Sequence, residues 1–180
     1  MKAKKTSSSA DIAGGDGGDE LDAWSKELYN KPGHLIRRCY QIVMALYIEE
    51  ASGIGLTQLQ YVVLRVINQY PGESQRRLGE LAAVDRTTVG WVVNSLEEKK
   101  LIVRKSDAKD RRLLLLKLTP LGHQKLKAVD SRMQQLQARI LEPLAPSERL
   151  QFVEHLRTIV LANNRYSRAP HTRRRARPSS

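Results

Sequence analysis

Apolar side chains recur every three or four residues along most of the chain, a spacing that predicts a mainly helical protein. The first helix is expected to begin after Pro32-Gly33 and to run to about Ser52, where Gly53 and Gly55 end it. Its predicted inward stripe consists of Leu35, Cys39, Ile42, Val43 and Leu46. A second helix is expected from Thr57, which can form a capping box with Gln60, to the turn at Pro71-Gly72. Its stripe consists of Leu59, Val62, Val63, Val66 and Ile67.

Two short helices are predicted between residues 74 and 96, with Ser74 and Asp85 as their N-caps and a tight turn at Ala83-Val84 between them. The expected inward positions are Leu78, Leu81 and Ala82 in the first, and Val89, Val92, Val93 and Leu96 in the second. This spacing is typical of a helix-turn-helix. The outward face of the second helix carries small, hydrogen-bonding and aromatic residues: Thr87, Thr88, Gly90, Trp91 and Asn94.

Residues 101–105 and 113–118 are two β-prone runs that bracket a polar, charged turn, which is typical of a hairpin. The leucine run alternates poorly and would also permit a buried helix. Thr119-Pro120 favours the hairpin, because a Thr cap followed by Pro is a strong signal for a new helix. That helix has a seam spaced 3-4-3-4, formed by Leu126, Val129, Met133, Leu136 and Ile140. After Pro143 and Pro146, Ser147 is expected to cap a last helix that carries Leu150, Val153, Leu156, Ile159 and Val160.

The 180 residues carry a formal net charge of +12, and this charge is unevenly distributed. Residues 1–22 have a net charge of −2, residues 165–180 contain six Arg and no acid, and the remainder carries +8. Both ends are rich in polar residues and are expected to be disordered. A basic body with an arginine-rich tail favours a polyanionic partner, either nucleic acid or an anionic membrane surface. No apolar face accompanies the tail arginines, which argues against the membrane.

Other classes of protein find little support in the sequence. It has no apolar run long enough for a transmembrane helix and no apolar stretch typical of a signal peptide near the N-terminus, so we expect a cytoplasmic protein. A single cysteine, Cys39, excludes a disulfide framework and a multi-cysteine zinc site. We find no glycine-rich phosphate loop, no metal-spaced histidine cluster and no nucleophile elbow, and therefore expect neither an enzyme nor a bound cofactor.

A helix-turn-helix followed at once by a hairpin with a basic tip is the winged-helix arrangement. A major groove admits one helix, whose exposed Thr, Asn and Arg side chains can bind base edges or phosphates. Lys109, Arg111 and Arg112 on the protruding turn can reach a neighbouring minor groove, whose negative potential attracts guanidinium groups. The two arginines could instead pair with Asp107 and Asp110 on a solvated turn. We favour contact with DNA because the helix and the basic wing occur together.

The sequence resembles the MarR family of bacterial transcription regulators over about Leu35 to Val160. The resemblance rests on five segments in order: residues 78–82 (LGELA), 85–89 (DRTTV), 96–102 (LEEKKLI), 107–112 (DAKDRR) and 118–122 (LTPLG). Two positions depart from the family pattern. Lys100 stands where the family often has Gly, and the bulky Trp91 lies on the face that would contact DNA.

The resemblance implies a mainly α fold with a small β-hairpin wing, in which two copies form a triangular homodimer through their first and last helices. It divides the chain into a disordered tail (1–22), a helical dimerisation region (23–56 and 119–164), a winged helix-turn-helix DNA-binding domain (57–118) and a basic disordered tail (165–180). Each subunit would bind one half of a pseudo-palindromic double-stranded operator. Half-sites would lie ~34 Å apart. Repression is the expected outcome.

The resemblance also implies roles for individual residues. Asp85 would cap the recognition helix, while Arg112 would enter the minor groove, braced by Asp110, with Lys109 and Arg111 on phosphates. The complete predicted DNA-binding set is Ser74, Gln75, Asp85, Arg86, Thr87, Thr88, Trp91, Asn94, Lys105, Lys109, Asp110, Arg111 and Arg112. Neutralising on the order of 8 phosphates would give a log–log salt slope near −7.

Residues 30–38 are similar to a segment of the subgroup that governs the breakdown of aromatic compounds, which implies an aromatic acid or its coenzyme A thioester as effector. The predicted effector-binding set is His34, Arg37, Arg38, Tyr40, Gln41, Met44 and Tyr61. These residues also have structural explanations. The arginines could equally well form salt bridges, His34 could cap the helix or face solvent, and the two tyrosines could belong to the hydrophobic core. Two other readings stay open. Cys39 could serve as a redox sensor, although we expect a buried, inert thiol, and the chain could be an architectural or RNA-associated protein without an effector.

Overall fold

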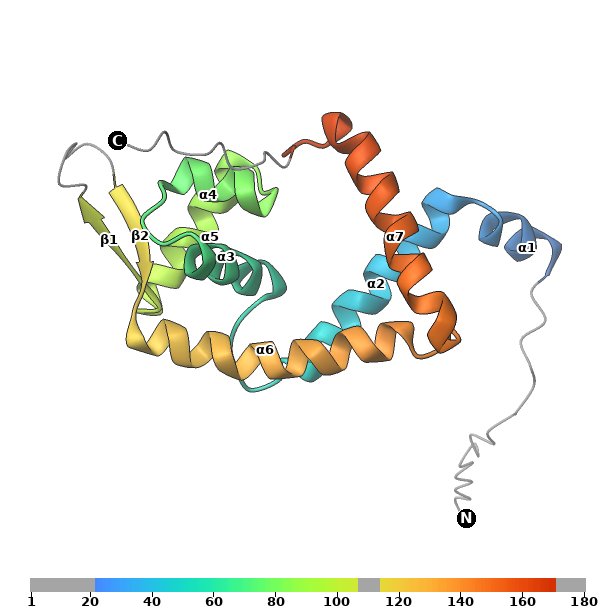
Figure 1. The fold of residues 1–180 in the computed structure, drawn as a ribbon, viewed down its shortest axis with the longest axis horizontal. Helices are drawn as coiled ribbons and strands as arrows, with labels where there is room; N and C mark the ends of the chain where they lie inside the picture. Colours follow the sequence, from blue (N-terminus) through green and yellow to red (C-terminus); the bar gives the residue numbers. More distant parts are fainter. Residues whose placement is uncertain (1–21, 107–113, 171–180) are drawn as a thin grey trace, which may run out of the picture. The chain divides into compact units, whose positions relative to one another are not determined.

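The computed structural model describes residues 22–106 and 114–170. Within these ranges the elements are α1 (Ala23–Tyr29), α2 (Pro32–Glu50), α3 (Gln58–Gln69), α4 (Gln75–Ala82), α5 (Arg86–Glu98), β1 (Ile102–Ser106), β2 (Leu114–Leu118), α6 (Pro120–Leu141), α7 (Pro146–Asn163) and the 3-10 turn η1 (Asn164–Tyr166) (Figure 1). The expected fold class is confirmed, since the described chain is mainly helical with one antiparallel hairpin after a helix-turn-helix. Residues 1–39 and 40–180 form separate compact units, and each is described by itself.

The first unit contains a helix that the apolar pattern did not predict. Asp22 caps α1 by accepting a hydrogen bond of 2.7 Å from the Ser25 amide, and this bond holds the pKa of the Asp22 carboxyl below its ordinary value. Residue 22 therefore belongs to a helix end and not to a disordered tail. The next helix, α2, begins at Pro32, close to the expected start. Leu35 and Cys39, both predicted to face inward, are exposed.

The second unit begins with a helix whose start is fixed locally. The Thr57 hydroxyl accepts from the Gln60 amide at 3.2 Å, and the Gln60 side chain accepts from the Thr57 amide at 3.0 Å, so the predicted capping box is present. Helix α3 then buries Val63, Leu64 and Ile67 completely. Val63 and Ile67 were predicted to face inward, whereas Leu64 was not. Leu64 is buried too because α3 contacts α4, α5 and α6 and is therefore covered on more than one side.

The helix-turn-helix forms as its caps predict. The Ser74 hydroxyl accepts from the Arg77 amide at 3.3 Å and starts α4, which ends at Ala83 in a left-handed conformation with φ of 53°. Asp85 then starts α5. The four residues of α5 that were predicted to face inward are all buried: Val89, Val92, Val93 and Leu96.

The hairpin pairs Ile102 with Leu118 at its base and Ser106 with Leu114 at its described end. Lys100, just before β1, has φ of 58°, a left-handed conformation that glycine adopts without the strain it costs a residue with a side chain. A short third segment joins the pair, since Ser74 forms an isolated bridge with Leu115. The hairpin is therefore held on one side by the start of α4. Its turn, residues 107–113, lies outside the described residues.

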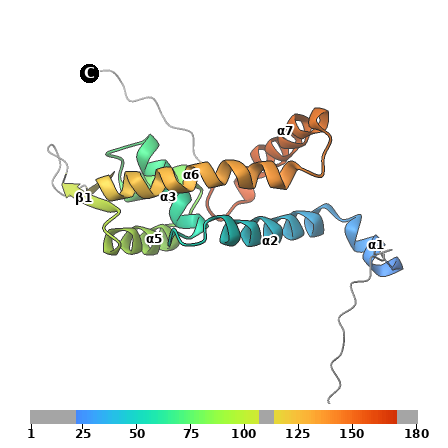
Figure 2. The same cartoon turned by 90° about the horizontal axis from the view of Figure 1, so that it is seen from below.

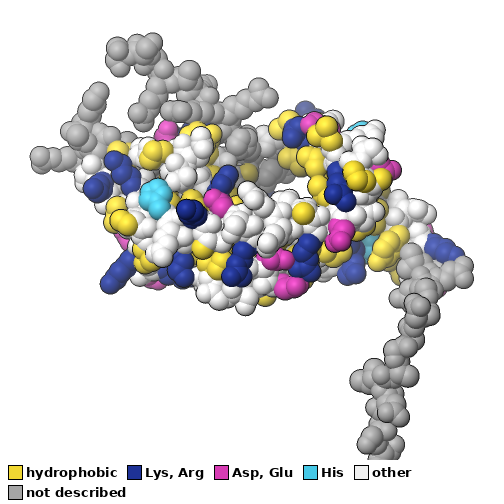
Figure 3. Space-filling model, turned by 60° about the horizontal axis from the view of Figure 1, so that its bottom comes forward, with side chains coloured by type: hydrophobic (Ala, Val, Ile, Leu, Met, Phe, Trp, Pro, Cys, Tyr) yellow, Lys and Arg dark blue, Asp and Glu magenta, His cyan; other side chains and the backbone are white. Residues whose placement is uncertain are grey.

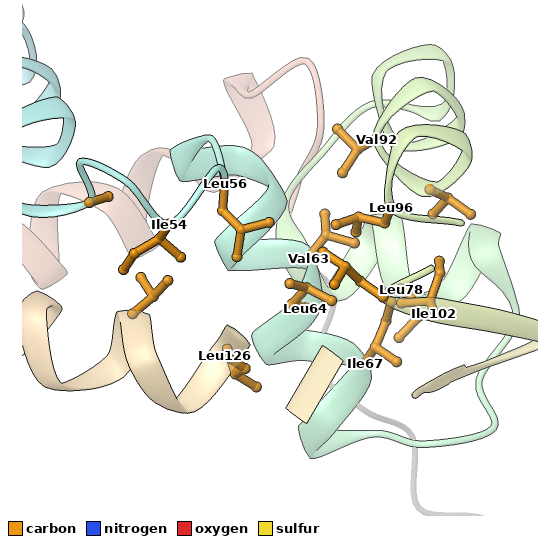
Figure 4. Packing of buried hydrophobic residues seen from close by; sticks show 14 of the residues in the cluster. Ile54, Leu56, Val63, Leu64, Ile67, Leu78, Val92, Leu96, Ile102 and Leu126 are labelled. Carbon is orange, nitrogen blue, oxygen red and sulfur yellow. The ribbon is translucent and has the colours of Figure 1, made fainter. Parts of the chain in front are cut away.

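One hydrophobic core joins the hairpin, the helix-turn-helix and α6. Figure 4 shows side chains from α3, α4, α5 and β1 converging, among them Leu64, Leu78, Leu96 and Ile102. Helix α6 lies alongside α3 in both ribbon views (Figures 1 and 2) and contributes its predicted seam to this core. The seam residues Leu126, Val129, Met133 and Leu136 are buried, and Ile140 is partly buried.

The loop between α2 and α3 is fixed by cations from other helices. Lys99, at the end of α5, donates to the Gly55 carbonyl at 2.7 Å and to the Gln60 side chain at 3.1 Å. From α6, Lys125 donates to the Ile54 carbonyl at 3.0 Å, and Arg132 donates to the Glu50 carbonyl at 2.9 Å. These bonds satisfy carbonyls that the end of α2 and the loop would otherwise leave without partners.

Two helices of the second unit keep apolar side chains on the surface. On α2, Tyr40 is 60% exposed and Ile42 is 51% exposed, although Ile42 was predicted to face inward. On α7, most of the apolar positions are exposed, including Leu150, Leu156, Ile159 and Val160. Figure 3 shows hydrophobic side chains on the molecular surface interspersed with Lys and Arg. Within the described part of a single chain, no other element buries these positions.

The last helix also corrects two details of the sequence analysis. Its N-cap is Ala145 rather than Ser147, with Pro146 in the first helical position and the Glu148 side chain accepting from the Ala145 amide at 3.1 Å. The described part of the predicted C-terminal tail is partly structured, since η1 extends to Tyr166. Among the described residues, no helix is both long and apolar enough to span a bilayer.

Gly122→Ala is expected to destabilise the fold by about 2 kcal/mol or more. A Cβ at residue 122 would overlap the carbonyl oxygen of Leu101, which is backbone and already accepts from the Thr119 amide at 3.0 Å. Denaturant unfolding at one fixed protein concentration measures the change. Gly33→Ala is the matched control, because its Cβ would meet no atom within 4 Å. It should leave stability unchanged or raise it by up to about 1 kcal/mol, and equal losses in both variants would contradict the explanation.

Candidate nucleic-acid interface

The recognition helix α5 begins at a well-formed cap. One carboxylate oxygen of Asp85 accepts from the Thr87 amide at 3.1 Å and from the Thr88 amide at 3.0 Å. Hydrogen bonding from Thr88, first through its side chain and then through its backbone, together with the Thr87 amide, holds the pKa of Asp85 below its ordinary value. Asp85 is thus ionised at neutral pH and fixes the first turn of the helix, in agreement with its predicted role as a cap.

The outward face of α5 presents three of the predicted residues together. Thr87, Trp91 and Asn94 are exposed and follow one another at helical spacings of four and three residues, so they share one side of the helix. Trp91 is 80% exposed, an unusual degree for a side chain of that size. Arg86, also exposed, lies at the start of the same helix. The face combines a cation, a hydroxyl, an indole and an amide.

Several other predicted DNA-binding residues are half-buried and have contacts within the protein. Ser74 is half-buried and caps α4. Gln75 is also half-buried and lies against Gly90 of α5, where its side-chain nitrogen would be 3.4 Å from a Cβ added to the glycine. Thr88 is half-buried. Lys105 is exposed on β1. Lys109, Asp110, Arg111 and Arg112 lie outside the described residues.

Arg104, which links the hairpin to the recognition helix, was not among the residues predicted from the sequence. Its guanidinium donates from one nitrogen to the Glu97 carboxylate and from the other to the Asn94 side-chain oxygen, the latter at 2.5 Å. Arg104 lies two residues after the buried Ile102, and alternation along a strand places both on one face, toward α5. That alternation was the available signal.

The predicted effector residues fall in different places. His34, Arg37 and Arg38 belong to the first unit, where the ring of His34 lies 5.4 Å from that of Tyr29. The Nε2 atom of His34 is buried and, among the described residues, has no hydrogen-bond partner. Arg37 is exposed.

The remaining effector candidates belong to the second unit. Tyr40 and Gln41 are exposed, which corrects the core reading of Tyr40. Met44 and Tyr61 line two different cavities.

Cys39 is exposed and not buried, so the expectation of a buried thiol is wrong for the described chain. Of the stripe on which it lies, Leu35 and Ile42 are exposed as well, whereas Leu46 packs against the core.

Two neighbouring cavities have Tyr47 and Gln58 in common. The first, of about 380 Å³, lies between α3 and α6 and is lined by Tyr61, Arg65 and Asp130 among others. The second, of about 510 Å³, is lined by Met44, Ile48 and the loop that follows α2. Sequence analysis missed Tyr47 and Asp130, since their positions come from packing between distant segments.

The polar side of the first cavity is a connected group. The Tyr61 hydroxyl donates to Asp130 at 3.0 Å, and the Arg65 guanidinium donates to both oxygens of the same carboxylate at 3.1 and 3.2 Å. Burial, and then the neighbouring carboxylate, raise the pKa of Tyr61 to about 12. Burial raises the pKa of Tyr47 to about 12 as well, and its hydroxyl donates to the Leu56 carbonyl at 3.2 Å. Both phenols are therefore neutral donors at physiological pH.

No group of three or more potential metal-ligating side chains occurs within residues 22–106 and 114–170.

Stability is expected to fall as the pH rises from about 10 to about 12, the ordinary and the raised pKa values of these tyrosines. The unfolded chain releases the two protons first, so deprotonation favours unfolding over that window and not below it. Absorbance titration of phenolate should show two late-titrating tyrosines in the native protein and none in the chain unfolded by guanidinium. Tyr61→Phe should remove one of the two. A native titration identical to the unfolded one would contradict the buried geometry.

Comparison with known proteins places this arrangement in a family. A family model described as MarR family matches residues 54–113. The PcaV transcriptional regulator from Streptomyces coelicolor, solved with its natural ligand, is 33% identical and has a TM-score of 0.70; the alignment covers 75% of this chain and 95% of that one. BpsR of Bordetella bronchiseptica, whose DNA binding is regulated by 6-hydroxynicotinic acid, is 31% identical with a TM-score of 0.66, covering 71% of this chain and 96% of that one.

The repressor CouR has been solved in two liganded states. Bound to a 23-mer DNA duplex it is 26% identical to this chain, with a TM-score of 0.69 and coverage of 74% and 95% of the two chains. CouR from Rhodococcus jostii RHA1 bound to p-coumaroyl-CoA is also 26% identical, with a TM-score of 0.64 and coverage of 73% and 93%. The winged helix-turn-helix, the sequence identities and the nearly complete coverage of these relatives agree: the chain belongs to the MarR family of transcriptional regulators.

Proposed function

We propose that this regulator is a repressor that binds a pseudo-palindromic operator as a homodimer and is released by an aromatic acid or its coenzyme A thioester. The observation that carries the proposal is the exposed face of α5, with Thr87, Trp91 and Asn94 in line beside the hairpin. The whole chain, with a net charge of +12, suits a polyanionic partner.

The chemistry of the α5 face suits a major groove. A single helix fits that groove, and hydroxyl, amide and indole groups can hydrogen-bond or pack against base edges. Arg86, at the start of the helix, suits a phosphate contact, because phosphate contacts position the protein while base contacts specify the sequence. The Asp85 cap fixes the backbone of the first helical turn, from which these side chains project.

The wing is proposed to extend the contact into a minor groove. Lys105 is exposed on β1, and the sequence between β1 and β2 contains Lys109, Asp110, Arg111 and Arg112. Guanidinium groups are favoured in narrow minor grooves because the electrostatic potential there is most negative. The roles of these four residues stay predictions.

A homodimer is proposed because α2 and α7 leave apolar side chains without cover. Ile42, Ile48, Leu150 and Val160 are more than half exposed. Contiguous exposed apolar side chains on a soluble protein often mark a protein–protein interface, and a homodimer is typical of the family. CouR bound to a DNA duplex supports the same partner for this chain.

The cavity between α3 and α6 is the proposed effector pocket. Its volume of about 380 Å³ suits a single aromatic ring with a small substituent, so the coenzyme A part of a thioester would lie outside it. The rings of Tyr47 and Tyr61 line it. Arg65 is paired with Asp130 through Nη1, and its other guanidinium N–H groups are the proposed donors to a ligand carboxylate. BpsR with 6-hydroxynicotinic acid and CouR with p-coumaroyl-CoA support this class of ligand. Participation of His34, Arg37, Arg38, Tyr40 and Gln41 stays a prediction.

A second candidate is redox sensing by Cys39. The observation that favours it is that the thiol is exposed in the described chain and follows Arg37 and Arg38 directly in sequence. Peroxide that releases DNA from the natural protein but not from Cys39→Ser would favour this candidate over a ligand.

Trp91→Ala is expected to weaken binding to the preferred operator by about tenfold or more, since base contacts contribute on the order of 1–3 kcal/mol each. The operator is obtained by selection from a random DNA library. The side chain is 80% exposed, so thermal stability should not change, and affinity for scrambled DNA should stay within about twofold. Tyr166→Ala, another exposed aromatic, is the control and should bind like the natural protein. Equal affinity of the natural protein for operator and scrambled DNA would refute the proposed function.

An aromatic acid such as 6-hydroxynicotinic acid, or p-coumaroyl-CoA, is expected to raise the melting temperature and release the operator. A ligand at 100 times its Kd that binds only the folded state stabilises it by about 2.7 kcal/mol. Tyr61→Phe removes the hydroxyl that donates to Asp130 and should reduce the thermal shift, whereas Tyr166→Phe should not. A screen of aromatic acids and their thioesters in which none stabilises the protein would contradict the effector class.

A further inference from the structure

Arg104 connects the wing to the surface that would face DNA. It lies on β1, opposite Leu116 of β2, with a side chain that is 25% exposed. Its two terminal nitrogens reach different residues of α5, Glu97 and Asn94. Glu97 and Asn94 are three residues apart and therefore neighbours on one side of the helix. The guanidinium thus spans two adjacent turns of the recognition helix.

The contact decides which way the Asn94 amide points. A guanidinium has five N–H donors and no acceptor, so the amide atom that faces it must be the oxygen. Arg104 Nη2 donates to Asn94 Oδ1, and the charge of the donor strengthens this hydrogen bond. With the oxygen held by Arg104, the NH2 group is the part of the amide left to donate outward. Asn94 is exposed on the same side of α5 as Trp91 and Thr87, so its donors face the proposed DNA surface.

We propose that Arg104 is a positioning residue that makes Asn94 a hydrogen-bond donor toward DNA, so that the half-site position read by Asn94 is a guanine. The inference rests on the proposed DNA-binding function. In the major groove guanine presents two adjacent acceptors, N7 and O6, which match the two hydrogens of one NH2 group. Adenine is usually read by an asparagine whose oxygen accepts from N6 while its NH2 group donates to N7; here the oxygen is directed to Arg104 of the wing, which disfavours that two-bond contact. Thymine presents a single acceptor, O4, and so offers one bond fewer than guanine. Cytosine presents only a donor.

Glu97 has a supporting part in this arrangement. Its carboxylate is 38% exposed near the surface that would approach phosphates, and pairing with Arg104 offsets its negative charge. Because both partners are partly exposed, the pair contributes little to stability. Changes at Arg104 are therefore expected to act on sequence preference more than on folding.

Selection from a random DNA library, followed by affinity measurements on single-base variants, tests the inference. The natural protein should prefer guanine over adenine by about tenfold at one position of each half-site. Arg104→Lys keeps the positive charge beside Glu97 but loses the two-nitrogen fork, so this preference should fall to about twofold or shift to adenine. The slope of affinity against salt should not change, because the net charge is conserved.

Two further variants separate the roles. Asn94→Asp presents acceptors alone and should shift the same position toward cytosine, whose N4 group donates. Glu97→Gln leaves the Arg104–Asn94 bond in place and should keep the guanine preference. Melting temperatures of all variants show whether each is folded, and either Asn94→Asp or Arg104→Lys suffices as a test if the other fails to fold.

The outcomes distinguish the inference from the proposed function. If the natural protein selects no consensus sequence, the proposed function fails. If it selects a pseudo-palindrome whose base preferences are the same in Arg104→Lys and Asn94→Asp, the DNA-binding function stands and the role of Arg104 is overturned. A shift at one symmetric pair of positions, in the directions given above, supports the inference.

Discussion

The recognition helix can offer a chemical face to a partner because its opposite face is fixed. Val89, Val93 and Leu96 are fully buried against α3, α4 and the hairpin, and Val92 is nearly so. Side chains at helical spacing cannot turn inward on both sides, so this burial commits Thr87, Trp91 and Asn94 to the surface. The Asp85 cap fixes where the helix starts, and Arg104 fixes the far end of the same face. Function therefore depends first on the packing of four apolar residues.

Features decided by neighbours in sequence could be predicted. The capping box at Thr57, the caps at Ser74, Asp85 and Thr119, and the α6 seam all follow from side chains within a few residues of one another. The exception is the last helix, which begins before Ser147, at Pro146, with the Glu148 carboxylate accepting from the Ala145 amide. Helix α1 was missed because its start depends on Asp22, at the edge of a polar stretch.

Features decided by distant segments could not be predicted. The Tyr61–Asp130 hydrogen bond joins residues 69 positions apart, and the cavity that they line depends on where α3 and α6 come together. Periodicity identified the apolar stripes of α2 and α7 but not what covers them, which is why Ile42 and Cys39 were expected inside the chain and lie outside it. An amphipathic pattern predicts that one face of a helix will be buried, but it does not predict whether the same chain or a second molecule buries it.

The uncovered faces of α2 and α7 have a consequence for how the regulator persists in the cell. If a second subunit covers them, folding and assembly become one equilibrium governed by mass action, and the free energy of unfolding varies with the number of protomers present. A scarce chain would then be less stable and more exposed to proteolysis than an abundant one. The abundance of the protein would itself set a threshold for occupancy of the operator, before any effector arrives.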